Sequence, residues 1–290
     1  MVKKLLPALL AALLCGSCGI LYLTPFPSIL PLAEKSIDLS GRMPEADEDS
    51  WDVRLALLNG YLFLTVKDKL AILDSELKVL KEYDGQYGRL AVYNGTDYFI
   101  GREQYGAAPG FSHLGTTTYA QENLGYYDPG APPPGVVTLS CGGGSLYTNG
   151  VVGPFSTPMP GDLNLGAALA DDLGPSVFLF FKGNDSEEGV VVKVDRTLIR
   201  SGTLGAYPFG VAVVDLSAGE EGRFFYTHDG FVCSRDEGRW LIRYGFDGSE
   251  KSALTGRRMK SFAAAFDLDG ATFYLYDGGV RRLYKCRTWW

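Results

Sequence analysis

The sequence is poor in the residues that carry most catalytic and metal chemistry. It has 2 His and 5 Cys among 290 residues. Neither His113 nor His228 stands at the spacing of a metal site or a catalytic triad, and no zinc-type cluster of Cys and His occurs beyond residue 18. No G-x-S-x-G, H-E-x-x-H, P-loop or Rossmann pattern is present. No motif-defined class of enzyme is therefore indicated, and we expect no metal or other cofactor.

Basic residues are also in short supply. The chain has 27 Lys and Arg against 34 Asp and Glu, which gives a formal net charge of −7. Loss of Lys3 and Lys4 with an N-terminal signal would change this from −7 to −9. A nucleic-acid-binding protein needs a basic surface, so we expect no nucleic acid partner.

Cysteines are too few and too unevenly placed for a disulfide framework. Beyond the N-terminal segment only Cys141, Cys233 and Cys286 remain, and three thiols allow at most one bridge. The alternative is that all three are small buried apolar residues. The sequence does not decide between these two interpretations.

A long apolar run occurs only at the N-terminus. Lys3 and Lys4 precede an apolar stretch, and small residues then lead to Cys18, which is the arrangement of an export signal. A small residue directly before a Cys resembles the lipobox of bacterial lipoproteins, which implies lipidation of Cys18. An uncleaved membrane anchor between Leu5 and Leu23 and ordinary signal cleavage are the alternatives. In each case the body of the protein lies outside the cytoplasm.

The remaining chain divides into a short tether and one large domain. We predict a signal peptide over residues 1–17, a lipidated Cys18 with a tether over residues 18–34, and a β domain over residues 35–290. The tether is rich in Pro, which favours a semi-rigid spacer. The domain combines 37 Gly with abundant aromatics and frequent Asn-Gly and Asp-Gly pairs, a composition typical of turn-rich β proteins.

One phrase recurs along this domain: an apolar run, a turn residue, and a second apolar run. Copies begin at the following positions: RLALLNGYLFL at Arg54, RLAVYNGTDYFI at Arg89, VVTLSCGGGSLY at Val136, and further copies at Ala167, Val211 and Phe262. A β-type repeat with a period of roughly 40 residues predicts propeller blades. We predict an all-β, six-bladed β-propeller of four-stranded antiparallel blades, with a five-bladed ring as the alternative.

The clearest blade follows Arg54, and a second can be traced from Val177. The first predicts strands over 54–58, 61–66, 69–73 and 77–83, joined by turns such as Asn59-Gly60. The second predicts strands over 177–182, 189–194 and 197–200. The segment from Gly101 to Pro160 is rich in Gly, Pro and Tyr, and its strands cannot all be placed from the sequence.

The two ends of the domain predict how the ring closes. The last copy lacks a fourth strand, and KSIDLSGRM from Lys35 resembles KSALTGRRM from Lys251, which precedes the sixth copy. We therefore expect Ile37–Leu39 to pair with the strand at Val280–Cys286. Such closure removes open sheet edges, which are prone to aggregation.

Alignment of the copies exposes a column of turn residues and a pair of arginines. The turn column comprises Asn59, Asn94, Cys141, Asp172, Asp215 and Asp267, which we place directly after each innermost strand. Arg54 and Arg89 both occupy the start of an innermost strand. Their guanidiniums could clamp a carboxylate or phosphate at the channel mouth, because Arg offers a bidentate fork. The alternative is that each pairs with a nearby carboxylate such as Asp52.

The segment GYLFLTVKDKLAILDSELKVLKEYDG, from Gly60 to Gly85, resembles the repeats of bacterial extracytoplasmic β-propellers of the LVIVD and YVTN types. Their third strand runs into an Asp, a feature present here at Leu70–Asp74. The resemblance implies a propeller in the bacterial cell envelope, facing the periplasm or exterior. It implies no activity, because such folds host many functions.

Two functional interpretations stay open. The preferred one is a monomeric, membrane-tethered module that binds a protein or small ligand without catalysis. The other is an extracytoplasmic hydrolase or lyase acting on carbohydrate or a small ester. An enzyme of this fold should gather carboxylates or a metal at the channel mouth. A binding module should instead present aromatic or apolar patches on its loops.

Overall fold

The computed structural model describes residues 32–47, 53–85, 87–120, 123–142, 145–148, 155–158, 163–170, 175–183, 189–205, 211–216, 224–227, 229–235, 240–255, 259, 261–267 and 269–290. The predicted signal peptide, Cys18 and most of the tether lie outside these residues, as do Asp52, Asp172 and His228. Within the described part of the chain, no helix is both long and apolar enough to span a membrane.

The described strands form six four-stranded antiparallel sheets. The first two contain β2 (Val53–Leu58), β3 (Tyr61–Val66), β4 (Lys69–Asp74) and β5 (Val79–Asp84), then β6 (Ala91–Tyr93), β7 (Tyr98–Ile100), β8 (Glu103–Tyr105) and β9 (His113–Thr116). The next contains β10 (Leu124–Tyr127), β11 (Val136–Gly142), β12 (Ser145–Thr148) and β13 (Phe155–Pro158). The fourth contains β14 (Leu163–Ala170), β15 (Ser176–Gly183), β16 (Gly189–Asp195) and β17 (Val211–Leu216). The fifth contains β18 (Phe224–Thr227), β19 (Gly230–Arg235), β20 (Trp240–Gly245) and β21 (Glu250–Thr255). The sixth contains β22 (Phe262–Phe266), β23 (Thr272–Asp277), β24 (Arg282–Arg287) and β1 (Ala33–Asp38).

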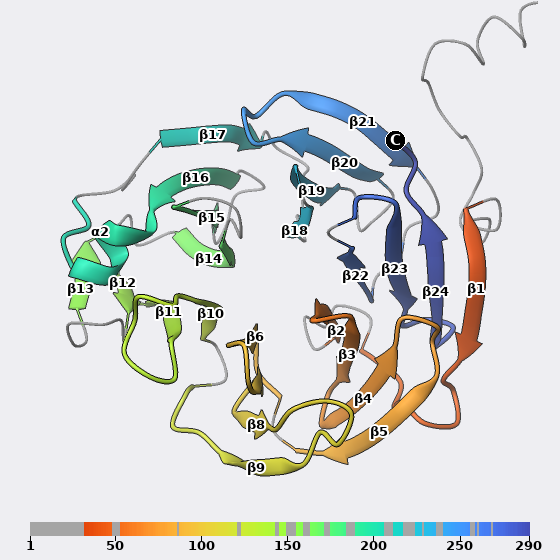
Figure 1. The fold of residues 1–290 in the computed structure, drawn as a ribbon. Coiled ribbons are helices and arrows are strands. Elements are labelled where there is room, and N and C mark those ends of the chain that lie inside the picture. Colours follow the sequence, from red (N-terminus) through yellow and green to blue (C-terminus); the bar gives the residue numbers. More distant parts are fainter. Residues whose placement is uncertain are drawn as a thin grey trace, which may run out of the picture.

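The sheets are arranged as blades around a common centre, so the predicted all-β propeller is confirmed (Figure 1). The first strand of each blade lies innermost, and these strands contact one another in turn around the ring: β2 with β6, β6 with β10, β10 with β14, β14 with β18, β18 with β22 and β22 with β2. Apolar side chains pack between neighbouring blades, and this burial holds the ring together.

The N-terminal strand closes the ring as predicted. β1 pairs antiparallel with β24, with Ile37 opposite Leu283 and Asp38 opposite Arg282. The backbone N–H of Leu39 donates to the carbonyl of Arg281 at 2.9 Å, and the Leu39 side chain is fully buried. The outermost strand of the last blade therefore comes from the front of the domain, and it takes the position that β21 has in the blade before it.

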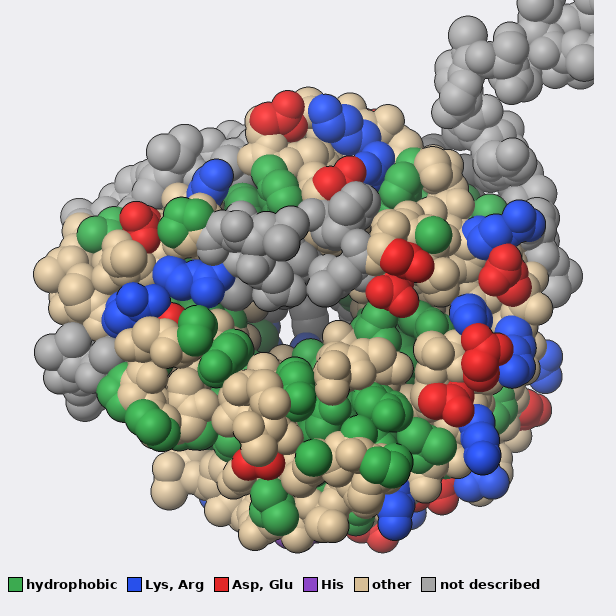
Figure 2. All heavy atoms as spheres, in the orientation of Figure 1, with side chains coloured by type: hydrophobic (Ala, Val, Ile, Leu, Met, Phe, Trp, Pro, Cys, Tyr) green, Lys and Arg blue, Asp and Glu red, His purple; other side chains and the backbone are tan. Residues whose placement is uncertain are grey.

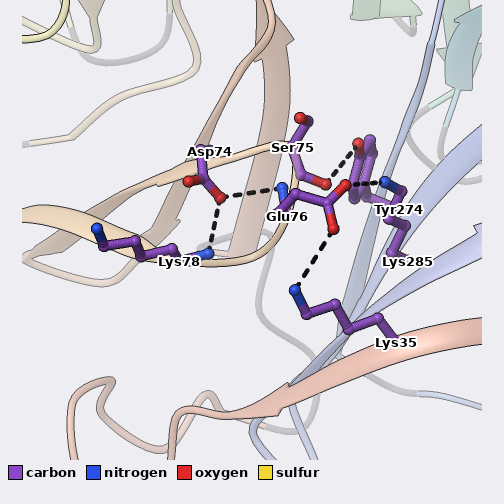
Figure 3. A network of polar contacts seen from close by, with 7 residues as sticks. All are labelled: Lys35, Asp74, Ser75, Glu76, Lys78, Tyr274 and Lys285. Carbon is purple, nitrogen blue, oxygen red and sulfur yellow. Dashed lines mark hydrogen bonds and ion pairs between the residues drawn. The ribbon is translucent and has the colours of Figure 1, made fainter.

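Charged side chains reinforce this closure at the rim, where they gather near β24 and β1 (Figure 2). The Glu76 carboxylate, in the turn between β4 and β5, accepts from Lys285 Nζ at 2.5 Å and Lys35 Nζ at 3.4 Å (Figure 3). The contact with Lys285, followed by that with Lys35, lowers the pKa of Glu76 below its usual value. One carboxylate thus joins the first blade to both outer strands of the last blade.

Two of the six sequence copies were assigned to the wrong strand within their blade. Val136 begins β11, the second strand of its blade, and Val211 begins β17, the outermost strand. Consequently Cys141 and Asp215 do not follow innermost strands. The strands β11 and β17 are as apolar as the innermost strands of their blades, so a local apolar–turn–apolar pattern does not encode the position of a strand between centre and rim.

The predicted strand at 197–200 is a short helix instead. α2 (Arg196–Ser201) begins after Asp195, whose carboxylate accepts from the backbone N–H of Thr197 at 2.8 Å. It ends at Gly202, which has a left-handed φ of 69°. These two caps satisfy the ends of the helix and outweigh the β preference of the Thr and Ile within it. The fourth strand of this blade is β17.

The turn-residue interpretation holds where the innermost strand was identified correctly. Asn59 adopts a positive φ of 50°, the left-handed conformation that Asn tolerates well. The Asn94 side chain accepts from the backbone N–H groups of Thr96 and Asp97 at 3.0 and 2.8 Å. Among the described residues, no disulfide joins Cys141, Cys233 and Cys286, of which Cys233 and Cys286 are buried and Cys141 is half-buried.

Candidate binding face

The two predicted ligand-binding arginines lie at the entrance of neighbouring innermost strands. Arg54 is in β2, opposite Thr65 of β3, and Arg89 stands two residues before β6. Burial lowers the pKa of Arg89, whose charge lies near the Cys141 thiol. Burial in turn raises the pKa of Cys141 to about 11. Binding of an anion by the arginine pair stays a prediction.

The opposite ends of the same strands lead into a different kind of surface. β2, β6 and β10 end at Leu58, Tyr93 and Tyr127, and each then turns into the second strand of its blade. We define the tyrosine–proline face as the four loop segments at this side of three neighbouring blades: residues 57–61, 93–97, 106–112 and 127–135. Figure 2 shows hydrophobic side chains gathered over β2 to β8 on this side of the ring.

The tyrosine–proline face is almost free of charge. Its four segments contain no Lys, Arg or Glu, and its two Asp side chains are both engaged. Asp97 accepts from Gln104 Nε2 at 2.8 Å, and the buried Asp128 accepts from Arg200. Lys, Arg, Asp and Glu side chains instead crowd the rim near β24 and β1 (Figure 2). The face therefore differs from the acidic protein as a whole.

A buried phenylalanine anchors the loop between β8 and β9. The Phe111 ring is fully buried, and it lies 4.9 Å from the Tyr61 ring and 5.6 Å from the Tyr98 ring. Its backbone carbonyl accepts from the Tyr83 hydroxyl at 2.5 Å. Because Tyr61 and Tyr83 belong to the preceding blade, Phe111 fixes this loop against its neighbour through both its ring and its backbone.

Two asparagines tie the remaining loops together across blade boundaries. Asn59 Nδ2 donates to the Tyr98 hydroxyl at 3.2 Å, which links the first blade to the second. Asn94 Nδ2 donates to the carbonyl of Pro134 at 3.0 Å, which links the second blade to the third. Tyr93 stacks on Tyr98 with ring centroids 4.6 Å apart. The loops of three blades thus form one connected platform.

An ion pair fixes the proline-rich loop between β10 and β11. Asp128 is fully buried and accepts from Arg200 at two positions, from Nη2 at 2.5 Å and from Nε at 3.0 Å. The backbone N–H of Gly130 donates to the same carboxylate at 2.9 Å. A Cβ at Gly130 would overlap the Arg200 guanidinium, so only glycine permits this approach. The interaction fastens α2 of the fourth blade to the loop of the third.

Tyrosines beneath the face are held in their neutral form. Burial raises the pKa of Tyr87 to about 12 and also raises the pKa values of Tyr83 and Tyr98. Tyr87 and Tyr105 share a hydrogen bond between their hydroxyls at 2.9 Å. Ionisation of these groups is therefore absent near neutral pH, and the platform keeps its neutral character there.

One polar cluster lies behind this platform. The buried Glu103 carboxylate contacts His113 Nε2 at 2.7 Å and accepts from the Thr116 hydroxyl at 2.9 Å. It joins β8 to the outermost strand β9. Among the described residues, no group of three or more His, Cys, Asp or Glu side chains is placed to hold a metal ion.

Partial signals for this face are present in the sequence. The Gly-, Pro- and Tyr-rich segment from Gly101 to Pro160 indicates irregular structure, but the sequence alone does not place its strands and so does not show which of its loops lie together. Tyr93 and Tyr127 occupy equivalent ends of β6 and β10, and an alignment that begins the third copy at Val136 does not match these two residues because Val136 begins β11. The sequence contains no Lys, Arg or Glu between residues 123 and 181, a run that includes the loop at residues 127–135.

Comparisons with known proteins support the fold alone. No family model matches the chain, and no curated protein matches it. Among solved structures it is similar to a chain of Kuenenia stuttgartiensis hydrazine synthase, with a TM-score of 0.55 and 9% identity over 86% of this chain and 98% of that chain. It is also similar to the Cps50 (Swd1) β-propeller domain of Myceliophteria thermophila, with a TM-score of 0.56 and 9% identity over 88% of this chain and all of that domain.

Proposed function

We propose that this protein is an exported, membrane-tethered β-propeller that binds a partner protein through its tyrosine–proline face. The observation that carries the proposal is the composition of that face, which presents Tyr, Pro and Leu on loops and engages both of its carboxylates internally. This is the pattern expected of a binding module. Tyrosine is enriched at protein interfaces, because it offers a large contact area with few rotatable bonds.

The rigidity of the face favours binding as well. Phe111, the two asparagine links and the Asp128–Arg200 pair fix the loops of adjacent blades before any partner arrives. A surface that is ordered in advance loses less conformational entropy on association. Adjacent blades thereby present several short loops as one surface, which no single loop could provide.

The cellular location of the protein is part of the same proposal. The charged N-terminus, the apolar run and the small residues before Cys18 support export and lipidation at that cysteine. Lipidation would hold the propeller at a membrane surface in the bacterial cell envelope, with its loops free to meet a partner. Mass spectrometry of the mature N-terminus tests this part: an acylated Cys18 is expected, and an intact residue 1–23 segment would contradict it.

Two tyrosines of the same blade allow a matched test of the binding face. Tyr127 lies on the face and is 37% exposed, whereas Tyr147 lies in β12 and is 46% exposed. The protein is purified from its native envelope after chemical cross-linking, as wild type, Tyr127→Ala or Tyr147→Ala. We expect the same co-purifying protein with wild type and Tyr147→Ala, and its loss with Tyr127→Ala. Equal recovery in all three would refute the assignment of the face.

A further inference from the structure

The tyrosine–proline face also indicates which class of partner it can bind. We propose that this face binds an uncharged, proline-rich segment of a partner protein in the polyproline II conformation. The inference rests on the proposed binding function and adds the class of partner. It follows from the charge, the aromatic arrangement and the rigidity of the four loop segments.

The lack of charge on the face limits which partner side chains can be buried there. The carboxylates of Asp97 and Asp128 already accept from Gln104 and Arg200, and the four segments hold no Lys, Arg or Glu. A charged partner side chain buried here would lose its hydration and find no opposite charge in these loops. Such burial is costly for either sign of charge. A neutral partner segment avoids this cost.

The aromatic arrangement then favours an extended, proline-rich chain. Tyr93 and Tyr127 stand at equivalent ends of the neighbouring innermost strands β6 and β10, which contact each other, and Tyr61 follows the end of β2. These tyrosines provide apolar ring surfaces on adjacent blades, and the Tyr93 hydroxyl is held in place because it donates to the carbonyl of Gly95 at 2.8 Å. Proline-rich segments dock on aromatic surfaces in this way, because their exposed backbone carbonyls accept hydrogen bonds and their rings pack on aromatic ones.

The rigidity of the loops also favours a partner in the polyproline II conformation. Asn59, Asn94 and Phe111 hold the loops in place, and the polyproline II helix is itself ordered before it binds. Two ordered surfaces lose little conformational entropy when they associate, so a modest contact area can suffice. A flexible or strongly charged partner would gain neither advantage from this surface.

The test is a titration of the purified full chain with a short, blocked peptide of repeated Pro-Pro-Leu units, followed by fluorescence anisotropy. A matched peptide with Lys in place of Leu supplies the charged control, and a neutral oligosaccharide and neutral phosphatidylcholine vesicles supply the other ligand classes. We expect the Pro-Pro-Leu peptide alone to bind. Its affinity should change less than about twofold between low and high salt, because no exposed charge pair forms.

Tyrosine substitutions test where on the protein the peptide binds. Tyr93→Ala and Tyr127→Ala should each weaken peptide binding by about tenfold, the effect of a central interface residue, whereas Tyr147→Ala should leave it unchanged. Circular dichroism checks that each variant stays folded. Tighter binding of the Lys peptide, of the oligosaccharide or of the vesicles would overturn the inference, and so would insensitivity to both face variants. If the envelope partner is lost with Tyr127→Ala but the Pro-Pro-Leu peptide does not bind, the inference is wrong and the proposed function stands.

Discussion

Removal of the ion pair between Asp128 and Arg200 should produce a specific loss of stability. Asp128 is fully buried, and Arg200 donates to it from two nitrogens. Arg200→Met removes the cation and leaves the buried carboxylate to accept from the backbone N–H of Gly130. Loss of one partner from a buried pair costs about 3–5 kcal/mol. Because the Arg200 side chain is one-third exposed, solvent reduces this to about 2–3 kcal/mol of unfolding free energy.

A double-mutant cycle separates this pair from general packing effects. Asp128→Asn keeps the size of the side chain and removes its charge, so the combined variant no longer buries an unpaired carboxylate. The two single changes should therefore be less than additive, with a coupling free energy of about 1–3 kcal/mol. Urea denaturation of the wild type, both single variants and the double variant gives the four free energies. Additive losses, or an Arg200→Met variant as stable as wild type, would refute the role of the pair.

A glycine pair provides an independent control on the same interaction. Gly130→Ala places a methyl group on the Arg200 guanidinium and should displace it. At Gly110, in a neighbouring loop of the same face, a Cβ would lie 3.7 Å from the carbonyl of Ala107, an ordinary contact. Gly130→Ala should therefore reduce stability while Gly110→Ala does not. Equal effects of the two changes would show that the close approach of Arg200 is not what requires glycine.

Other consequences can be measured in the same way. Phe111→Ala should cost about 3–5 kcal/mol in denaturant unfolding, because it empties a buried aromatic site; a loss below about 1 kcal/mol would contradict its anchoring role. Glu76→Gln should destabilise the protein at neutral pH. The difference from wild type should shrink in unfolding scans once the pH falls below about 4.5 and disappear below the lowered folded-state pKa of Glu76, because the ionised carboxylate is what the lysines stabilise. A difference that persists in acid would argue against the Glu76–lysine contacts as its source. Arg54→Ala/Arg89→Ala should abolish binding of phosphate or citrate in calorimetry if the arginine pair forms an anion site, and unchanged binding would dismiss that site.

Much of the fold could be predicted from the sequence, because its strands carry strong local signals. In the first blade, the turns Asn59-Gly60 and Lys67-Asp68 separate the first three strands. Asn59, Gly60 and Lys67 adopt the positive φ that such turns require. The ring closure was also predictable, because a missing strand at one end of the domain matched a spare strand at the other. The position of each strand within its blade was not, since β11 and β17 are as apolar as their neighbours and only long-range contacts distinguish them.

The candidate site was less accessible to sequence reasoning. Arg54 and Arg89 were identified because they repeat at the same alignment position, and a repeat is visible in sequence. The tyrosine–proline face is harder to recognise, because it is assembled from loops of three blades that are joined only in the folded protein, by Asn59 with Tyr98 and by Asn94 with Pro134. Its defining property is a regional lack of charge. The sequence shows part of this property as a run without Lys, Arg or Glu from residue 123 to 181, and the fold places the neutral loops of the first two blades beside the loop at residues 127–135.

Site-specific photo-cross-linking in the intact cell envelope tests the central claim most directly. A photoreactive phenylalanine analogue replaces Tyr127 on the tyrosine–proline face or, as the control, Tyr147 in the same blade. We expect one discrete protein adduct from position 127 and none of that mass from position 147. An adduct from position 147 alone, or the same adduct at equal yield from both positions, would contradict the claim that this face binds the partner.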